Sequence, residues 1–299
     1  MPNRFTLDHA VLVVPDLISG GDLFSRLGFT VTPGGVHAGG LTHNALIPFQ
    51  DGSYLELLAA VQPASLHLLR PLRTLGLLGL HPAGKTRFSR RFIDHLLIGP
   101  GINDYALACT QLDQAVGQAA GRGMILDGPH PGGRVRPDGQ QVSWRTASPP
   151  TLDLPFLIDD LTPHQLRVPA GTACQHPNRL VGIEGIYLLV EDLPRGWQGY
   201  SQLLALDPDR AGVVGMDTAS ETFYLGTMHI TLLDVNTQQN AGTLCSYLAS
   251  RPGRPCALQL RTDQGQSQYL VYDSSRGYIL TTSGRISTCK SGDDFALRQ

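Results

Sequence analysis

The stretch Leu7-Asp8-His9-Ala10-Val11-Leu12-Val13-Val14-Pro15-Asp16-Leu17 occurs a second time in the chain in altered form. The second copy is Ile183-Glu184-Gly185-Ile186-Tyr187-Leu188-Leu189-Val190-Glu191-Asp192-Leu193, and the two align without a gap as far as residues 24–25 and 200–201. In the first copy, residues 7–14 predict a strand and residues 18–27 a short helix that ends at Gly28. The similarity of the two segments indicates an internal duplication.

The residues that follow the first copy complete a small structural unit. Residues 29–32 predict a second strand, and residues 42–49 and 53–58 predict two more. Asp51-Gly52 lies between the last two strands and is a strong hairpin signal, because both turn positions need a positive φ. The first part of the chain therefore predicts a βαβββ unit.

The same unit recurs along the chain, so we expect an α+β protein made of four tandem βαβββ modules. The second unit comprises a strand at 105–109, a helix at 112–121 and strands at 124–126, 142–146 and 155–158. The third begins at residue 183, and the fourth comprises a strand at 228–234, a helix near 242–250 and strands at 257–261, 268–272 and 278–281. This predicts an N-terminal domain over residues 1–160 with a helical insertion at 61–100, a linker at 161–181 and a degenerate C-terminal domain at 182–299.

The composition excludes several classes of protein. The chain has 299 residues, of which 41% are hydrophobic and 16% charged, which argues against disorder. A net charge of -2 offers no basic surface for nucleic acid, and no apolar run reaches the roughly 20 residues of a membrane span. Five cysteines without a Cys-x-x-Cys pair exclude a zinc ribbon and are typical of reduced thiols. We expect a cytoplasmic protein that binds neither nucleic acid nor membranes.

The two N-terminal units together resemble a glyoxalase-like domain of the vicinal oxygen chelate (glyoxalase/bleomycin resistance/dioxygenase) superfamily. In the first unit the resemblance lies in Leu7–Asp16, Leu27–Val31, Gly40–Asn44 and Tyr54–Leu58. In the second it lies in Leu112–Val116, Arg122-Gly123, Arg136–Gly139 and Pro155–Asp159, so that it covers roughly residues 5–160. It implies half-barrel sheets with helices on the convex face and a ligand or divalent metal on the concave face. Many members chelate vicinal substrate oxygens on that metal, whereas members of the bleomycin-resistance type only bind.

His9 and Glu56 are the first candidates for a functional site. Strand alternation places His9 on a face with Leu7 and Val11, and Glu56 on a face with Tyr54. A carboxylate in such an apolar strand needs a partner, a metal or a proton. The resemblance implies that His9 and Glu56 are metal ligands, for which Zn, Fe, Mn, Ni and Co are all suitable. The alternative is that the two side chains only hydrogen-bond each other.

The second unit leaves this ligand set incomplete. By the resemblance, Tyr105 stands where His9 stands and Asp159 where Glu56 stands, so Asp159 is expected to be the third ligand. His43 shares the face of Glu56 if Asp51-Gly52 is a two-residue turn, but it lies roughly 13 Å further along at about 3.3 Å per residue. We therefore expect His43 to act as a general base or to lie at the cavity mouth, with a surface histidine as the alternative.

Further residues are candidates for contact with a small-molecule substrate. Tyr54 and Trp144 could form aromatic walls, and Arg136 or Arg145, with Arg134, could hold an anion. Core packing for the tryptophan and a solvated face for the arginines are the alternatives.

The C-terminal half lacks the matching chemistry. Gly185 replaces His9 and Leu280 replaces Glu56, so we expect a structural or oligomerisation role there, such as a homodimer contact, or a metal-free pocket.

Two functions remain open at this point. The first is a metal-dependent lyase, isomerase or dioxygenase that acts on a small oxygenated metabolite, with His43 or Tyr105 handling protons. The second is a non-catalytic small-molecule binding protein of the bleomycin-resistance type. No Gly-x-Ser-x-Gly or Walker-type motif suggests a third.

Overall fold

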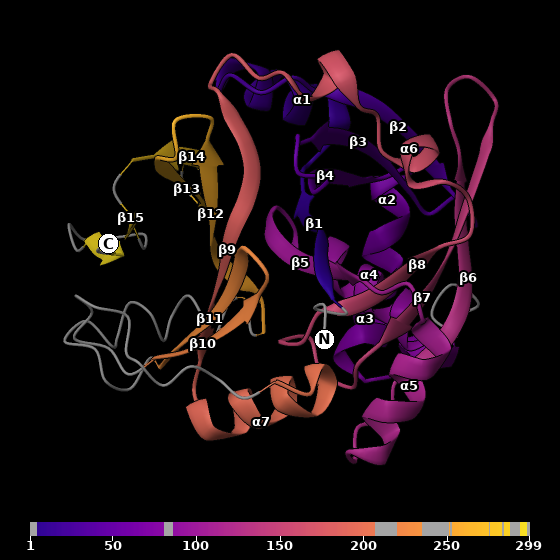
Figure 1. Cartoon of the computed structure of the whole chain (residues 1–299). Coiled ribbons are helices and arrows are strands. Elements are labelled where there is room, and N and C mark those ends of the chain that lie inside the picture. Colours follow the sequence, from indigo (N-terminus) through magenta and orange to yellow (C-terminus); the bar gives the residue numbers. More distant parts are fainter. Residues whose placement is uncertain are drawn as a thin grey trace.

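The N-terminal part of the chain forms a closed eight-stranded barrel (Figure 1). A computed structural model of the protein describes residues 5–80, 86–206, 220–234, 251, 253–274, 276–282, 284–287 and 294–297. The barrel strands are β1 (Thr6–Val13), β2 (Thr32–His37), β3 (Thr42–Pro48), β4 (Tyr54–Ala60), β5 (Gly101–Ala108), β6 (Asp127–Val135), β7 (Gln141–Ser148) and β8 (Phe156–Asp160). Their order around the barrel is β1-β4-β3-β2-β6-β7-β8-β5.

This order divides the barrel into two modules of four strands, as the duplication predicts. The first module is β1–β4 and the second is β5–β8. In each module the first strand is parallel to the last, β1 to β4 and β5 to β8. The modules meet at two antiparallel seams, β1 with β5 and β2 with β6, which lie on opposite sides of the barrel. The predicted α+β fold of tandem half-barrels is therefore confirmed.

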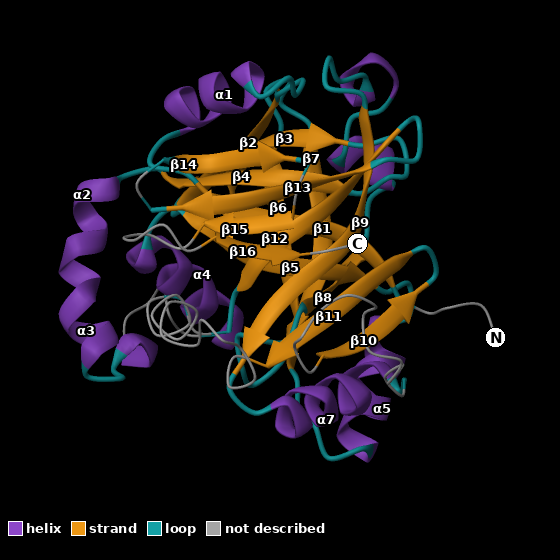
Figure 2. Ribbon diagram, turned by 90° about the vertical axis from the view of Figure 1, so that its left-hand side faces the viewer, coloured by secondary structure: helices purple, strands orange, loops and turns teal. Residues whose placement is uncertain are grey.

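Helices surround this barrel. They are α1 (Leu17–Arg26), α2 (Pro63–Leu66), α3 (Arg70–Thr74), α4 (Arg87–Ile98), α5 (Leu112–Gly121) and α6 (His164–Arg167), with short 3-10 turns η1 (His67–Leu69), η2 (Leu78–Leu80) and η4 (Gly171–Cys174). Helix α1 begins at Asp16, whose carboxylate accepts hydrogen bonds from the backbone of Ile18 and Ser19 and so satisfies two free amides of the first turn. Figure 2 shows α2, α3 and α4, all from the insertion, together on one side of the strands.

The C-terminal part is a six-stranded open sheet with one long helix. Its elements are β9 (Leu180–Val190), α7 (Leu193–Leu204), β10 (Ser220–Leu225), β11 (Met228–Asp234), β12 (Pro255–Thr262), β13 (Ser267–Asp273) and β14 (Gly277–Thr281), and a separate pair is formed by β15 (Gly284–Ser287) and β16 (Asp294–Leu297). The strand order is β10-β11-β9-β12-β13-β14. In Figure 1, α7 runs beneath this sheet and beside the barrel.

The strand pairing corrects the predicted fourth unit. Strand β11 is parallel to β9, as β4 is to β1, so residues 228–234 end the third unit and do not begin a fourth. The helix expected near 242–250 lies outside the described residues. Gly185 pairs with His229 as His9 pairs with Tyr54, so Gly185 does stand at the position of His9. By the same register Thr231, and not Leu280, stands at the position of Glu56.

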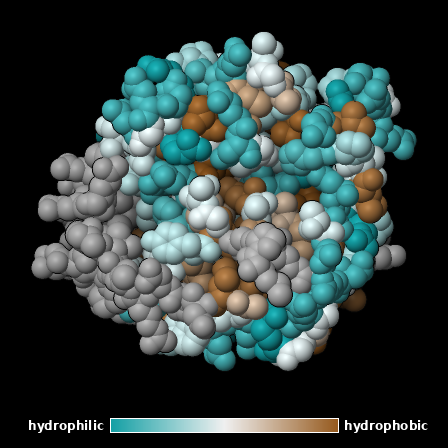
Figure 3. Space-filling view, viewed as in Figure 1, coloured by the Kyte–Doolittle hydropathy of each residue, from teal (hydrophilic) through white to brown (hydrophobic). Residues whose placement is uncertain are grey.

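One hydrophobic core continues from the barrel into the C-terminal sheet. Buried Phe24 and Leu107 from the barrel belong to the same cluster as Ile186 and Leu258 from the sheet. The hydroxyl of Tyr278 donates to the carbonyl oxygen of Val13 over 2.7 Å and ties β14 to β1. On the face seen in Figure 3, hydrophilic residues cover much of the described surface and hydrophobic residues show in patches between them. None of the described helices has the length and hydropathy that a membrane crossing requires.

Two predicted strands were misplaced, and they are the same strand in each module. Residues 29–31 and 124–126 lie outside strands, whereas β2 and β6 begin at Thr32 and Asp127. Both strands contain Pro-Gly-Gly, at residues 33–35 and 131–133, which masks the alternating pattern of a strand. These strands form the seam opposite β1 and β5, and each contributes a side chain to the interior cavity.

Candidate functional site

A cavity of about 470 Å³ lies inside the barrel. A volume of this size is typical of small-molecule sites. Its walls combine ionisable, aromatic and glycine residues from both modules and from α4, and they include His9, His37, Tyr54, Glu56, Phe88, Phe92, His130, Arg134, Trp144, Phe156 and Arg167.

The first module contributes one polar side chain from each of its four strands. We call this set the polar row: His9 from β1, Glu56 from β4, Asn44 from β3 and His37 from β2. The Nε2 atom of His9 lies 3.4 Å from Oε2 of Glu56, and Nε2 of His37 lies 3.4 Å from Oε1. Asn44 Nδ2 donates to Oε1 over 2.6 Å. Glu56, which is 4% exposed, is thus surrounded by polar side chains from the adjacent strands β1 and β3 and from β2, one strand further on.

Both imidazoles of the polar row are fixed through their Nδ1 atoms. His9 Nδ1 lies 2.6 Å from Oδ1 of Asp8, and His37 Nδ1 lies 2.8 Å from Oγ1 of Thr42. These contacts set the ring orientation and direct both Nε2 atoms toward Glu56. A histidine anchored at one nitrogen by a carboxylate and free to bind at the other is the usual form of a metal-ligating histidine.

Charge in the polar row is strongly coupled. Burial would raise the pKa of Glu56, but hydrogen bonds with His37 and His9 hold it well below its usual range. Burial would likewise lower the pKa of His9, but Asp8 and Glu56 outweigh it and raise the pKa to about 9. Glu56 is therefore a carboxylate at neutral pH, and His9 is an imidazolium when no metal competes for its Nε2.

Arg167 binds Asp8, the residue that anchors His9. Its Nη1 and Nη2 atoms donate to the two carboxylate oxygens of Asp8 over 2.9 and 2.6 Å, and its Nε donates to Oδ1 of Asp160 over 2.5 Å. Arg167 is 1% exposed and lies in α6, within the segment predicted to be a linker. Burial would raise the pKa of Asp8, but Arg167 and His9 together lower it.

A possible metal site lies in this second cluster. One ligand atom each of Asp8, Asp160 and His164 all lie within 4.8 Å of one another. The guanidinium of Arg167 contacts all three residues, with His164 Nδ1 at 3.4 Å from its Nη2. Since the guanidinium already supplies the positive charge, a cation at this position would have to displace Arg167.

The second module supplies an apolar surface opposite the polar row. We call it the aromatic wall: Trp144 from β7, Phe156 from β8, and Phe88 and Phe92 from α4. The Phe88 and Phe92 rings lie 5.2 and 6.0 Å from the Phe156 ring, and Phe156 contacts His9 edge-on at 5.5 Å. The inserted helix thus packs its aromatic side chains into the barrel interior.

Strand register identifies the residues of the second module that correspond to His9 and Glu56. β1 and β5 have equal length, and the fourth residue is His9 in β1 and Asp104 in β5. The seam agrees with this correspondence, because His9 pairs with Ala106 and Val11 with Asp104. Glu56 pairs with Val11 and Phe156 with Ala106, so the same correspondence maps Glu56 onto Phe156. Asp104 is already paired with Arg91 and with His95, whose Nε2 lies 2.7 Å from Oδ2. The second module therefore offers no ligand at either position.

Two predicted site residues of this module consequently lie elsewhere. Tyr105 points away from the cavity, and its hydroxyl bonds that of Tyr200 on α7 in the core between the two halves. Asp159 lies on the outer face of β8, where Oδ2 accepts from Arg145 Nη2 over 2.6 Å. Each of the two residues is one position out of phase with the inward face of its strand, so neither Tyr105 nor Asp159 is among the residues that line the cavity.

His43 is also misplaced by one residue of register. Glu56 pairs with Leu46, and by alternation Asn44, not His43, shares its face. The connection is longer than the expected two-residue turn, because Phe49 N donates to Ser53 O and three residues lie between them. His43 therefore lies on the outer face of β3, outside the cavity.

The substrate-contact candidates divide into two groups. Tyr54 and Trp144 line the cavity as expected, and Tyr54 stacks on His9 with ring centroids 4.6 Å apart. Arg145 instead bridges Asp113 and Asp159 outside the barrel, over 2.7 and 2.6 Å. Arg136 also lies outside the cavity, and its guanidinium is 2.9 Å from Asp138.

Arg134 lines the cavity, as one of the arginines expected to hold an anion, and so do His37 and Arg167, whose roles the residue pattern did not predict. The repeated Pro-Gly-Gly was the available signal for the first two residues. A Cβ at Gly34 would lie 2.0 Å from Asn44 Oδ1, and a Cβ at Gly132 2.4 Å from Trp144 Nε1. These glycines leave room for side chains that cross the strand to reach the interior. For Arg167 no local pattern exists.

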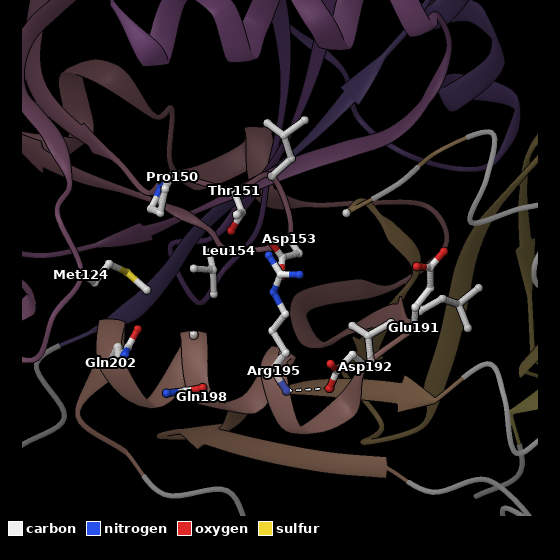
Figure 4. A pocket seen from close by; sticks show the side chains of 16 residues that line it. Met124, Pro150, Thr151, Asp153, Leu154, Glu191, Asp192, Arg195, Gln198 and Gln202 are labelled. Carbon is white, nitrogen blue, oxygen red and sulfur yellow. Dashed lines mark hydrogen bonds between the residues drawn. The ribbon is translucent and has the colours of Figure 1, made fainter.

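A second cleft, of about 690 Å³, lies between the barrel and α7 (Figure 4). Its polar side chains include Asp153, Glu191 and Arg195, and Asp192 accepts a hydrogen bond from the backbone of Arg195 over 2.9 Å. The described residues that line it include neither histidine nor cysteine. The chemistry of the described residues is thus concentrated in the barrel cavity, although the cleft is larger.

The polar row is suited to a divalent cation by donor type. Two imidazole nitrogens and one carboxylate form a common ligand set for Zn and non-haem Fe. In this structure the imidazoles of His9 and His37 approach opposite oxygens of Glu56. The ligand atoms of these three residues do not all lie within 4.8 Å of one another, unlike those of Asp8, Asp160 and His164, so a cation bound at the carboxylate would have to draw the two imidazoles together. The second module, where Asp104 is ion-paired and Phe156 is apolar, could add no ligand.

A solved structure of low sequence identity shares this architecture over nearly the whole chain. A hypothetical protein from Staphylococcus aureus matches with a TM-score of 0.65 and 14% identity, over 92% of this chain and 98% of that one. A xylose isomerase-like TIM barrel/4-hydroxyphenylpyruvate dioxygenase fusion protein matches with a TM-score of 0.50 and 14% identity, over 88% of this chain and 38% of that one. Methylmalonyl-CoA epimerase from Mycobacterium tuberculosis matches with a TM-score of 0.33 and 17% identity, over 52% of this chain and 88% of that one.

Sequence comparison gives the family directly. No curated protein matches the chain. The profile of the glyoxalase-like domain family matches residues 7–204, which include both barrel modules, β9 and α7. The chain therefore belongs to the glyoxalase-like domain family.

Proposed function

We propose that the barrel cavity is a metal-dependent active site that acts on a small oxygenated metabolite. His9, His37 and Glu56 are the proposed ligands. The observation that supports this most is the orientation of the two imidazoles, each anchored at Nδ1 and each directing Nε2 toward one buried carboxylate. A single histidine would be enough to form an ion pair with Glu56, so the presence of a second one favours a shared ligand.

The proposed reaction is that of a lyase, isomerase or dioxygenase of the vicinal oxygen chelate type. A divalent Zn, Fe, Mn, Ni or Co ion would act as a Lewis acid on substrate oxygens. The aromatic wall would exclude water and orient the apolar part of the substrate. Proton transfer would fall to His130, which lines the cavity outside the ligand set and whose Nε2 lies 3.0 Å from Oδ1 of Asp127.

Elemental analysis of protein purified without chelator tests the metal. We expect close to one divalent ion per chain, retained in His43→Ala and lost in His9→Ala and Glu56→Gln. His43 is a suitable control because it is a histidine of the same module on the opposite face of β3. A metal content far below one ion per chain, or one that is unchanged in His9→Ala, would contradict the proposal.

A non-catalytic small-molecule binding protein is the second candidate. It is favoured by the loss of both ligand positions in the second module, where Asp104 is neutralised by Arg91 and Phe156 is apolar. This alternative predicts that the protein binds a ligand in the cavity with metal absent and that chelators leave the affinity unchanged.

A further inference from the structure

Arg134 is a buried cation in the cavity without an anionic partner. It is 5% exposed and lines the cavity on β6, where it pairs with His37 across the seam. Its Nη2 donates to the carbonyl oxygen of Arg167, and its Nε has no hydrogen-bond partner. Among the residues that the structure describes, no carboxylate forms an ion pair with it.

The other buried arginine of the cavity shows the contrast. Arg167 binds Asp8 through two nitrogens and Asp160 through two. A buried guanidinium without such a partner is strongly destabilising, so it is retained where something else supplies the negative charge. Burial, only partly offset by Tyr54 and Glu56, lowers the pKa of Arg134, which agrees with a charge left uncompensated.

The pairing of charges in the cavity also leaves a place for one anion. Glu56 is the one carboxylate among the described residues that line the cavity, and it is held by His9, His37 and Asn44. Arg167 is paired with Asp8 and Asp160, so Arg134 is the guanidinium left without an ion pair, whether or not the metal of the proposed function is bound. A ligand with a single carboxylate would pair it.

The shape of the cavity indicates the rest of the ligand. Arg134 lies at the β2–β6 seam, whereas Phe156, Phe88 and Phe92 gather beside His9 at the opposite seam. We propose that the cavity takes an aromatic or similarly planar monocarboxylate, whose carboxylate pairs with Arg134 and whose ring lies against the aromatic wall. A planar fork of donors such as a guanidinium matches a carboxylate in geometry as well as in charge.

Isothermal titration calorimetry with 2-naphthoate and its neutral analogue 2-naphthamide tests this inference. Both probes are titrated into chelator-treated protein and into protein loaded with Zn²⁺. We expect 2-naphthoate to bind at least about tenfold more tightly than 2-naphthamide, as a charged hydrogen bond of ordinary strength provides. Arg134→Met removes this preference, whereas Arg145→Met, on the outer face of β7, retains it. Arg134→Lys keeps the charge without the fork and gives an intermediate preference.

Equal affinity for the two probes, no binding of either, or a preference that survives in Arg134→Met each overturns the inference. The comparison of the two probes in the unmodified protein stands even if a variant does not fold. Failure of the proposed enzyme is distinguishable, because it is measured by metal content. A protein that holds stoichiometric metal but binds both probes equally refutes only the ligand class. A metal-free protein that prefers 2-naphthoate through Arg134 refutes only the metal-dependent enzyme.

Discussion

Replacement of Arg167 by methionine should cost the protein a large part of its stability. The guanidinium is 1% exposed and forms paired hydrogen bonds with Asp8, which is itself 2% exposed. It also bonds Asp160 and the Tyr54 hydroxyl. Removal of one partner of a buried ion pair leaves the other charge uncompensated, which typically costs about 3–5 kcal/mol. Methionine keeps much of the side-chain volume, so the loss reports mainly on charge.

Urea and thermal unfolding followed by circular dichroism measure this loss. At a shift of at least about 2 °C per kcal/mol, the midpoint should fall by about 6 °C or more. Arg136→Met is the control, because its guanidinium lies outside the cavity beside the exposed Asp138, and it should change stability by less than about 0.5 kcal/mol. The double variant Arg167→Met/Asp8→Asn should lose less than the sum of the single losses, since it removes the unpaired carboxylate.

The same variant tests whether Asp8, Asp160 and His164 serve only as ion-pair partners of Arg167 or can also bind a cation. With the guanidinium gone, three ligand atoms that lie within 4.8 Å of one another become available to a cation. Added Zn²⁺ should then raise the midpoint of Arg167→Met more than that of the parent protein. A loss of less than about 1 kcal/mol in Arg167→Met, or strict additivity in the double variant, would refute the reasoning.

Three further predictions concern the second module. Asp104→Asn should destabilise the protein by about 3–5 kcal/mol, measured by urea unfolding, because it leaves Arg91 buried without its partner. The free energy of unfolding should fall as the pH drops below about 6.5, because burial lowers the pKa of His95 and the unfolded chain therefore binds the proton at a higher pH than the folded chain does. In His95→Phe the fall in the free energy of unfolding between pH 8 and lower pH should be smaller than in the parent protein. Gly132→Ala should cost about 1–3 kcal/mol and shift the fluorescence of Trp144, since the added Cβ would lie 2.4 Å from the indole nitrogen; an unshifted spectrum would contradict that contact.

Strands with continuous apolar runs were predictable from the sequence, and strands rich in glycine were not. β1 and β4 agree with the predicted ranges to within a few residues, because Val and Leu dominate their sequences. β7 also agrees, although its sequence is mixed and contains a single Val. β2 and β6 carry Pro-Gly-Gly in place of an alternating pattern and were shifted, although the parallel occurrence in both modules was visible. His37 was left without a role as a consequence, and Arg134 was predicted only as one of three arginines that could hold an anion.

The inward face of each strand depended on register that the sequence does not specify. A loop of three residues in place of two between Phe49 and Ser53 exchanges His43 for Asn44 beside Glu56. His9 and Glu56 were brought together as expected, since both lie in strands of unambiguous alternation. Arg167 could not be foreseen, because its partner Asp8 lies 159 residues earlier in the chain and no local pattern joins them.

The polar row and the aromatic wall come from different copies of one duplicated unit, and this has a consequence for how such a protein can change. Substitutions at Trp144 or Phe156, or at Phe88 and Phe92 of the inserted helix, would reshape the ligand's apolar surroundings while leaving His9, His37 and Glu56 as they are. The residues that select the ligand and the residues that react with it would then lie in separate halves of the barrel and could change independently. A designer who wishes to redirect the cavity to a new ligand could vary the second half and the insertion alone, and keep the first half fixed.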